Sequence, residues 1–64
     1  MTKDQIVAGQ HIVCVETSPD QKWNHSIKDD RATVTFVNEH GCGIHEPTIG
    51  PKHERVMTRW EVVR

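Results

Sequence analysis

Apolar and polar residues alternate along much of this chain with a period of two, which is the spacing of side chains on β-strands. The clearest case is residues 31–45, where Val34 and Phe36 alternate with two threonines before a run of turn-forming residues and a returning segment. This pattern predicts an antiparallel β-hairpin. Val34 and Phe36 are expected on one face of it and the threonines on the other.

Three other segments have strand character. Residues 10–17 contain four consecutive apolar residues, residues 26–28 form a short apolar-centred segment, and residues 54–63 resume the period of two. In the last segment, one set of positions is expected to face inward, namely Val56, Thr58, Trp60 and Val62. Met57 and Arg59 are then expected to face solvent.

The remaining segments are predicted as turns and loops. Thr2 and Gln5 have the spacing of a capping box, so either one helical turn or an extended lead-in is expected at the N-terminus, with Ile6 covering the core. Residues 18–26 form a polar loop, and residues 46–51 form a second loop whose prolines exclude a central strand.

The composition favours an all-β fold. The chain has thirteen valines and isoleucines and six threonines but no leucine, and β-branched side chains pack well on a pleated sheet. Its 64 residues allow one small domain, residues 1–64. We expect a five-stranded, strongly bent antiparallel sheet or barrel, because short strands must close on themselves or leave edges that aggregate.

The predicted strands resemble the Src-homology-three-like small barrels, including the KOW and Tudor types. The resembling segments are residues 9–15, residues 32–37 and residues 60–63. The resemblance implies the fold, but the chain lacks the aromatic dipeptides of a polyproline-binding groove, and Glu16 stands where KOW motifs have a glycine. Neither family's ligand is carried over.

Cysteine and histidine residues suggest two kinds of chemistry. A zinc site would use His40, Cys42 and His45, with Cys14 or His53 as the fourth ligand. A zinc site is disfavoured because the chain has no second Cys-x-x-Cys or His-x-x-His pair to complete the Cys-x-x-His pair. In addition, an unbridged Cys14 inside a strand is expected to act as a small buried hydrophobe. We therefore predict no metal and no cofactor.

A nucleophilic enzyme would need Cys42 activated by a neighbouring histidine, with an oxyanion site from the Gly41 and Gly43 amides. A core this small leaves no room for a large ligand cavity. We expect a protein that is not an enzyme.

Nucleic-acid binding is an alternative function. It would use cations and an aromatic residue near the C-terminus: Lys52, Arg55, Arg59, Trp60 and Arg64. The formal net charge of −1 is lower than that of a strong non-specific nucleic-acid binder. A small zinc-stabilised domain is the second alternative.

The favoured prediction is a protein-binding module, such as a phage or mobile-element accessory protein or inhibitor that covers a partner's surface. The predicted contacts are Lys22, Trp23, Arg55, Met57, Arg59 and the loop at residues 46–51. Trp23 could instead cover the core, and self-association stays open. Because no apolar run is long enough to cross a membrane and no signal peptide is present, we expect a cytoplasmic protein with no membrane partner.

Overall fold

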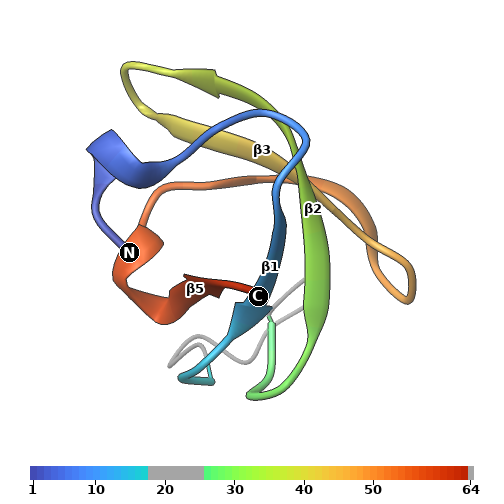
Figure 1. Ribbon diagram of the computed structural model, residues 1–64. Helices are drawn as coiled ribbons and strands as arrows, with labels where there is room; N and C mark the ends of the chain where they lie inside the picture. The colour runs from blue at the N-terminus through green and yellow to red at the C-terminus, as the bar shows by residue number, and fades with distance from the viewer. Residues whose placement is uncertain (18–25, 64) are drawn as a thin grey trace.

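The chain folds into one antiparallel sheet of five strands in the order β4-β3-β2-β1-β5 (Figure 1). The computed structural model describes residues 1–17 and 26–63. The strands are β1 (His11–Cys14), β2 (Arg31–Asn38), β3 (Gly41–Glu46), β4 (Gly50–Glu54) and β5 (Trp60–Val62), and two 3₁₀ turns are η1 (Lys3–Gln5) and η2 (Met57–Arg59). The predicted all-β class is confirmed. No helix among the described residues has the length and apolar character needed to span a membrane.

The sheet is strongly bent but is not closed into a barrel. Its two edges are β4 and β5, and no backbone pairing joins them within the described part of the chain. Of the two predicted forms, a bent sheet or a barrel, the bent sheet is the one observed, and each of its edges is protected in another way. In β4, Pro51 has no N–H to donate and Lys52 points inward, while β5 is only three residues long.

The strand boundaries differ from the predicted ones at three places. Residues 26–28 form no strand: they lead into a turn at Asp29, whose φ is +76°. Strand β4 begins at Gly50, inside the predicted loop, and is an edge strand, as its proline requires. The predicted strand at residues 54–63 is interrupted by η2, so only its last part pairs with β1.

Strands β2 and β3 form the predicted central hairpin. Its turn is stabilised by the backbone N–H of His40, which donates to Oδ1 of Asn38 at 2.8 Å. Gly41 begins β3 with a φ of +143°, and a Cβ at this position would lie 2.2 Å from the carbonyl oxygen of Glu54. Only glycine fits there, because β4 ends directly against the turn.

A β-bulge in this hairpin reverses the alternation of β2. Val34 pairs with Ile44 but Phe36 pairs with Gly43, so Thr35 is an extra residue in the strand. An extra residue moves every later side chain to the opposite face. Phe36 therefore faces away from Val34, and the prediction that the two share a face is wrong.

The N-terminal segment has one half of the predicted capping box, in which the Gln5 side chain reaches back to Thr2, while the N–H of Gln5 donates to the Thr2 backbone carbonyl at 3.0 Å. The backbone N–H of Thr2 donates to Oε1 of Gln5 at 2.9 Å, and one 3₁₀ turn follows. Gly9, with a φ of +91°, turns the chain toward β1, where its N–H donates to the carbonyl of Val34 at 2.8 Å. Ile6 is buried, as expected, and joins the core.

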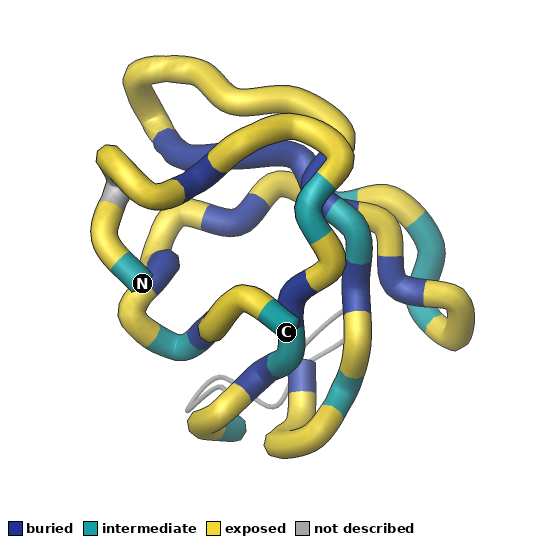
Figure 2. Tube along the Cα trace, in the orientation of Figure 1, coloured by how far each residue is buried: buried dark blue, intermediate teal, exposed yellow. Residues whose placement is uncertain are grey.

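The core lies on the concave side of the sheet, where buried positions alternate with exposed ones along β1 and the first half of β2 (Figure 2). Among the described residues it consists of Ile6, Ile12, Cys14, Ala32, Val34, Cys42, Ile44, Met57 and Trp60. Trp60 is fully buried, as predicted, but Val56, Thr58 and Val62 are exposed, so the prediction that they face inward is wrong. Residues 57–59 form a 3₁₀ turn with three residues per turn, so a period of two does not describe which side chains point inward there.

Candidate functional site

The predicted partner contacts do not form one surface. Lys22 and Trp23 lie outside the described residues. Met57, expected on the outside, is buried, and Sγ of Cys42 lies 3.4 Å from its Sδ. Because η2 turns this residue inward, the predicted outward position of Met57 is wrong.

The two remaining predicted contacts differ from each other. Arg55 is exposed. Arg59 is largely buried and forms an ion pair with Glu54 through one guanidinium nitrogen. Arg59 therefore holds the end of η2 against the end of β4 instead of facing solvent.

The groups that a nucleic-acid site would need are also engaged elsewhere. Trp60 is fully buried, so its ring is not exposed for stacking on a base. Nζ of Lys52 lies 3.5 Å from Oε1 of Glu46 and 3.6 Å from Oε2 of Glu54. Of the predicted set, Arg55 alone is an exposed cation in the described part of the chain, and Arg64 lies outside it.

The candidate metal ligands lie on different parts of the fold. Cys14 and Cys42 are free and buried in the core, while His45 is exposed on the opposite face of β3 from Cys42. His40 lies in the hairpin turn, where its Nε2 is 3.3 Å from Oε1 of Glu39. Among residues 1–17 and 26–63, no three His, Cys, Asp or Glu side chains are grouped as metal ligands.

Both thiols have the properties of core groups. Removal from water raises the pKa of Cys14 and of Cys42 above the ordinary value of 9.0. The Sγ of Cys14 donates to the carbonyl of Glu16 at 3.1 Å. A buried thiol with a raised pKa is a poor nucleophile, because the reactive species is the thiolate.

A buried polar network lies between the two sheet edges. The Ser26 hydroxyl donates to Oε1 of Glu46 at 2.5 Å and accepts from Nζ of Lys52 at 2.6 Å. Glu54 continues the network to Arg59 and accepts from the backbone N–H of Val56 at 3.2 Å. Side-chain charges thus hold together the region where no backbone ladder runs from β4 to β5.

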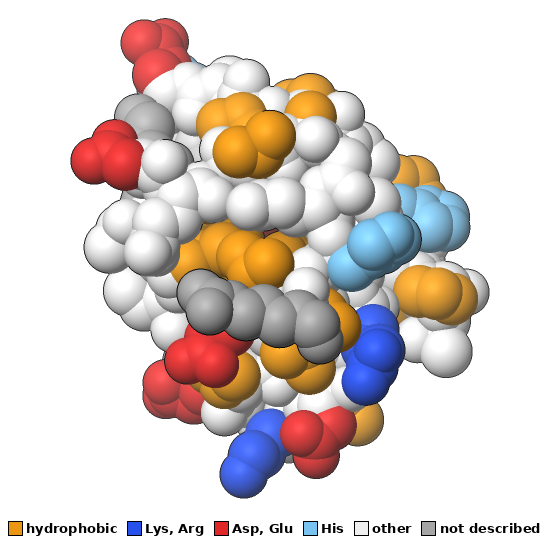
Figure 3. Space-filling model, viewed as in Figure 1, with side chains coloured by type: hydrophobic (Ala, Val, Ile, Leu, Met, Phe, Trp, Pro, Cys, Tyr) orange, Lys and Arg blue, Asp and Glu red, His pale blue; other side chains and the backbone are white. Residues whose placement is uncertain are grey.

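The outward side of β1–β4 is a continuous surface that we call the histidine face; it consists of His11, Arg31, Thr33, Phe36, His45, Pro51 and His53. The strand registers place Arg31 beside Val13 in one row. They align His11, Thr33, His45 and Pro51 in a second row, and Phe36 and His53 on either side of Gly43 in a third. The only acidic residues in β1–β4 are Glu46 and Glu54, and both are buried on the other side of the sheet. The space-filling view shows histidines gathered beside a Lys or Arg side chain, with carboxylates mainly along the opposite edge (Figure 3).

Phe36 is the aromatic centre of the histidine face. Phe36 is 48% exposed, and its ring lies directly over Gly43, where an added Cβ would come within 2.1 Å of the ring atom Cε1. On β4, the ring centroid of His53 lies 6.1 Å from the ring centroid of Phe36, and the two rings are tilted by 43°. This geometry falls within the range of favourable aromatic pairs, so the ring is held in place although half of it is in water.

Comparison of the chain with protein-family models, with curated proteins and with solved structures found no match. The functional interpretation therefore depends on the geometry of this chain. The resemblance to Src-homology-three-like barrels stays a prediction.

The sequence interpretation missed the histidine face. The alternation of His45 with Ile44 and of His53 with Lys52 was a usable signal, since it puts each histidine on one side of its strand. That signal becomes a surface only when the pairing of β3 with β4 aligns the two strands.

Proposed function

We propose that this protein is a non-enzymatic protein-binding module and that the histidine face is its contact surface. The observation that carries the proposal is the half-exposed Phe36 ring, fixed over Gly43 and against His53. Phenylalanine is enriched at the cores of protein interfaces and is uncommon as a fixed surface group. A ring that is already positioned loses little conformational entropy on binding.

The position of Cys42 supports the non-enzymatic part of the proposal. The residue that would serve as nucleophile is enclosed in the core, and burial raises the pKa of its thiol. A substrate would have to displace Met57 to reach the sulfur.

The intramolecular ion pairs of Lys52 and Arg59 favour a protein partner over a nucleic acid. Affinity for nucleic acid comes from several cations that contact successive phosphates. On the histidine face, Arg31 is the one arginine or lysine among the outward positions of β1–β4. A phage or mobile-element accessory role, inhibition of the partner and a cytoplasmic location stay predictions from the sequence.

Affinity capture with matched variants tests the proposal. Phe36→Ala should lose the proteins that the native chain retains from an extract of its source cells. Val56→Ala, which alters a side chain that is 52% exposed in the link from β4 to η2, should retain them. Circular dichroism must first show that both variants are folded.

The outcome identifies the class of partner. Loss with Phe36→Ala alone supports the histidine face. Equal retention by both variants contradicts it, and recovery of nucleic acid that is released steeply by salt would replace the protein partner with a nucleic acid.

A further inference from the structure

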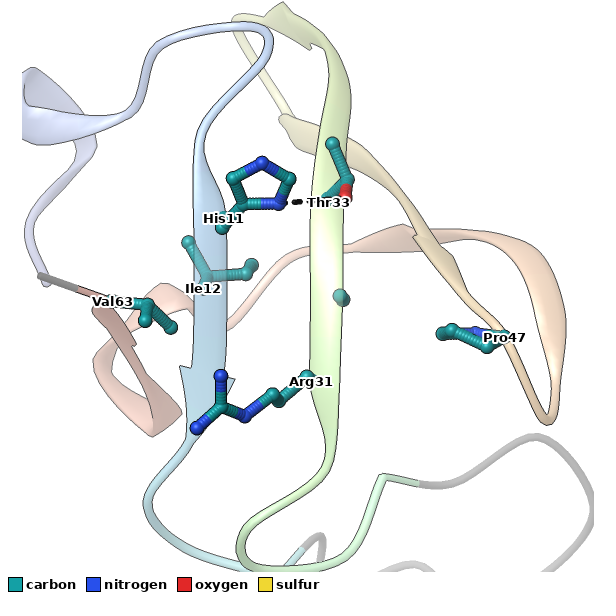
Figure 4. A pocket seen from close by; sticks show the side chains of 7 residues that line it. His11, Ile12, Arg31, Thr33, Pro47 and Val63 are labelled. Carbon is teal, nitrogen blue, oxygen red and sulfur yellow. Dashed lines mark hydrogen bonds between the residues drawn. The ribbon is translucent and has the colours of Figure 1, made fainter.

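An open pocket of about 370 Å³ lies on the histidine face, over β1 and β2 (Figure 4). Figure 4 shows the His11 and Thr33 side chains meeting across the two strands, with Arg31 further along β2. The pocket is lined by His11, Ile12, Arg31, Ala32, Thr33, Pro47 and Val63.

The polar groups of the pocket suit an anion. Nδ1 of His11 lies 3.3 Å from the hydroxyl oxygen of Thr33. With His11 as the donor in this hydrogen bond, the hydroxyl hydrogen of Thr33 is left to donate to a ligand. Arg31 lines the same pocket, and its guanidinium can donate two parallel hydrogen bonds to one carboxylate.

Arg31 has no intramolecular counter-ion in the described part of the chain. Lys52 and Arg59, by contrast, are paired with buried carboxylates. Among the residues that the structure describes, no carboxylate lines the pocket, and its apolar wall includes Pro47 and Val63. A cation beside an apolar wall attracts an anion more strongly than the same cation surrounded by water.

We propose that this pocket binds a carboxylate side chain of an acidic segment in the protein partner. The inference rests on the proposed function and specifies the chemistry of the partner. Phe36 lies three positions beyond Thr33 on the same face, about 10 Å along the strand. An extended peptide that places a glutamate or aspartate in the pocket therefore reaches Phe36 with an apolar residue two or four positions away, on the same face of the peptide.

A phosphate could supply the same charge, but the surroundings favour a peptide. Nucleic-acid binding uses a track of cations along the backbone. Arg31 is the one arginine or lysine among the described residues that line the pocket, and the outward neighbours on β3 and β4 are His45, Pro51 and His53. A single cation beside an aromatic residue matches an acidic and apolar peptide better than a phosphate chain.

The test uses the isotope-labelled protein and two acetylated, amidated decapeptides, one repeating Glu-Ser-Leu-Ser and the other repeating Gln-Ser-Leu-Ser, so that charged or amide residues and leucines share one face of the extended peptide. A ten-residue oligothymidine is the third probe. The glutamate peptide should shift the amide resonances of His11, Arg31 and Thr33 saturably. It should bind about tenfold more tightly than the glutamine peptide, which is the effect of one charge-assisted hydrogen bond.

Two variants assign the effect to the pocket. Arg31→Gln should remove the preference for glutamate over glutamine. Arg55→Gln, which removes an exposed arginine outside the pocket, should preserve it.

Each contrary result has a separate meaning. Equal binding of the two peptides around Phe36 would overturn the carboxylate pocket and leave the protein-binding module intact. Tighter binding of the oligothymidine than of either peptide would overturn both. If none of the probes shifts the pocket resonances, the pocket proposal fails, and capture with Phe36→Ala still decides the proposed function.

Discussion

Glu54 at the end of β4 and Arg59 at the end of η2 form an ion pair between the two edges of an open sheet. Oε2 of Glu54 also lies 3.6 Å from Nζ of Lys52, and the Glu54 side chain is 5% exposed. The pair connects β4 and η2 in a region where no backbone ladder runs from β4 to β5. Buried ion pairs of this kind are costly to break, because the remaining charge has no partner.

Glu54→Gln is therefore expected to lower the free energy of unfolding by about 3 kcal/mol. Glutamine keeps the shape of the side chain but removes the charge that Arg59 and Lys52 face. Urea denaturation measures the change. Glu39→Gln is the matched control, since Glu39 pairs with His40 in an exposed turn, and this variant should be close to wild type. Equal losses in the two variants would contradict a structural role for the buried pair.

Gly43→Ala should displace the Phe36 ring and leave the sheet intact. The atoms nearest to the added methyl group belong to the Phe36 ring and not to the backbone. The ring can rotate away, so the backbone need not move. Changed ring-proton shifts for Phe36 and His53, with unchanged circular dichroism, are the expected result.

A double-mutant cycle provides the control. In the Phe36→Ala background the methyl group has no ring to displace, so the stability effect of Gly43→Ala should become small. An effect of the same size in both backgrounds would show that the ring does not occupy the space over Gly43.

Gly41→Ala should be more destabilising than Gly50→Ala. Both residues have positive φ, which costs a non-glycine residue about 1–2 kcal/mol. At Gly41 the new Cβ also falls 2.2 Å from the carbonyl oxygen of Glu54, whereas nothing lies within 4 Å of the Cβ built at Gly50. Thermal unfolding of the two variants measures the difference. Equal melting temperatures would show that β4 does not press against the hairpin turn.

Stability should fall as the pH rises above the ordinary thiol pKa of 9.0, because burial raises the pKa of Cys14 and of Cys42 in the folded state. Below that pH both states hold the thiol protons, so the contribution to stability is fully present. Above it the unfolded chain releases protons that the folded chain retains. The free energy of unfolding should then decrease by about 1.4 kcal/mol per pH unit for each thiol.

Urea denaturation at about pH 8 and about pH 9.5 measures this slope, in a range below most lysine titration. The double variant Cys14→Ala, Cys42→Ala should show a flatter dependence, whatever its absolute stability. Iodoacetamide provides an independent check, since it should modify the thiols only after unfolding. Rapid modification of the native protein would contradict the burial of the two cysteines.

Much of the fold was predictable from local sequence. The hairpin at residues 31–45, the capping box of Thr2 and Gln5, and the buried positions of Cys14 and Trp60 all follow from residue type and short-range spacing. These features depend on steric preferences and hydrogen bonds within a few residues. The candidate site was less predictable: Met57 is buried, Arg59 is paired, and Lys22 and Trp23 lie outside the described residues.

By itself, the sequence determined that this protein is a small β-sheet domain with β-branched side chains in its core, because strand propensity and alternation are local properties. Tertiary structure decided which side of the sheet each later residue faces. The bulge at Thr35 turned Phe36 outward, and η2 turned Met57 inward. Pairing between distant strands aligned the histidine face and brought Glu54 to Arg59. Such arrangements arise from register and packing between separate segments, which no short stretch of the chain specifies.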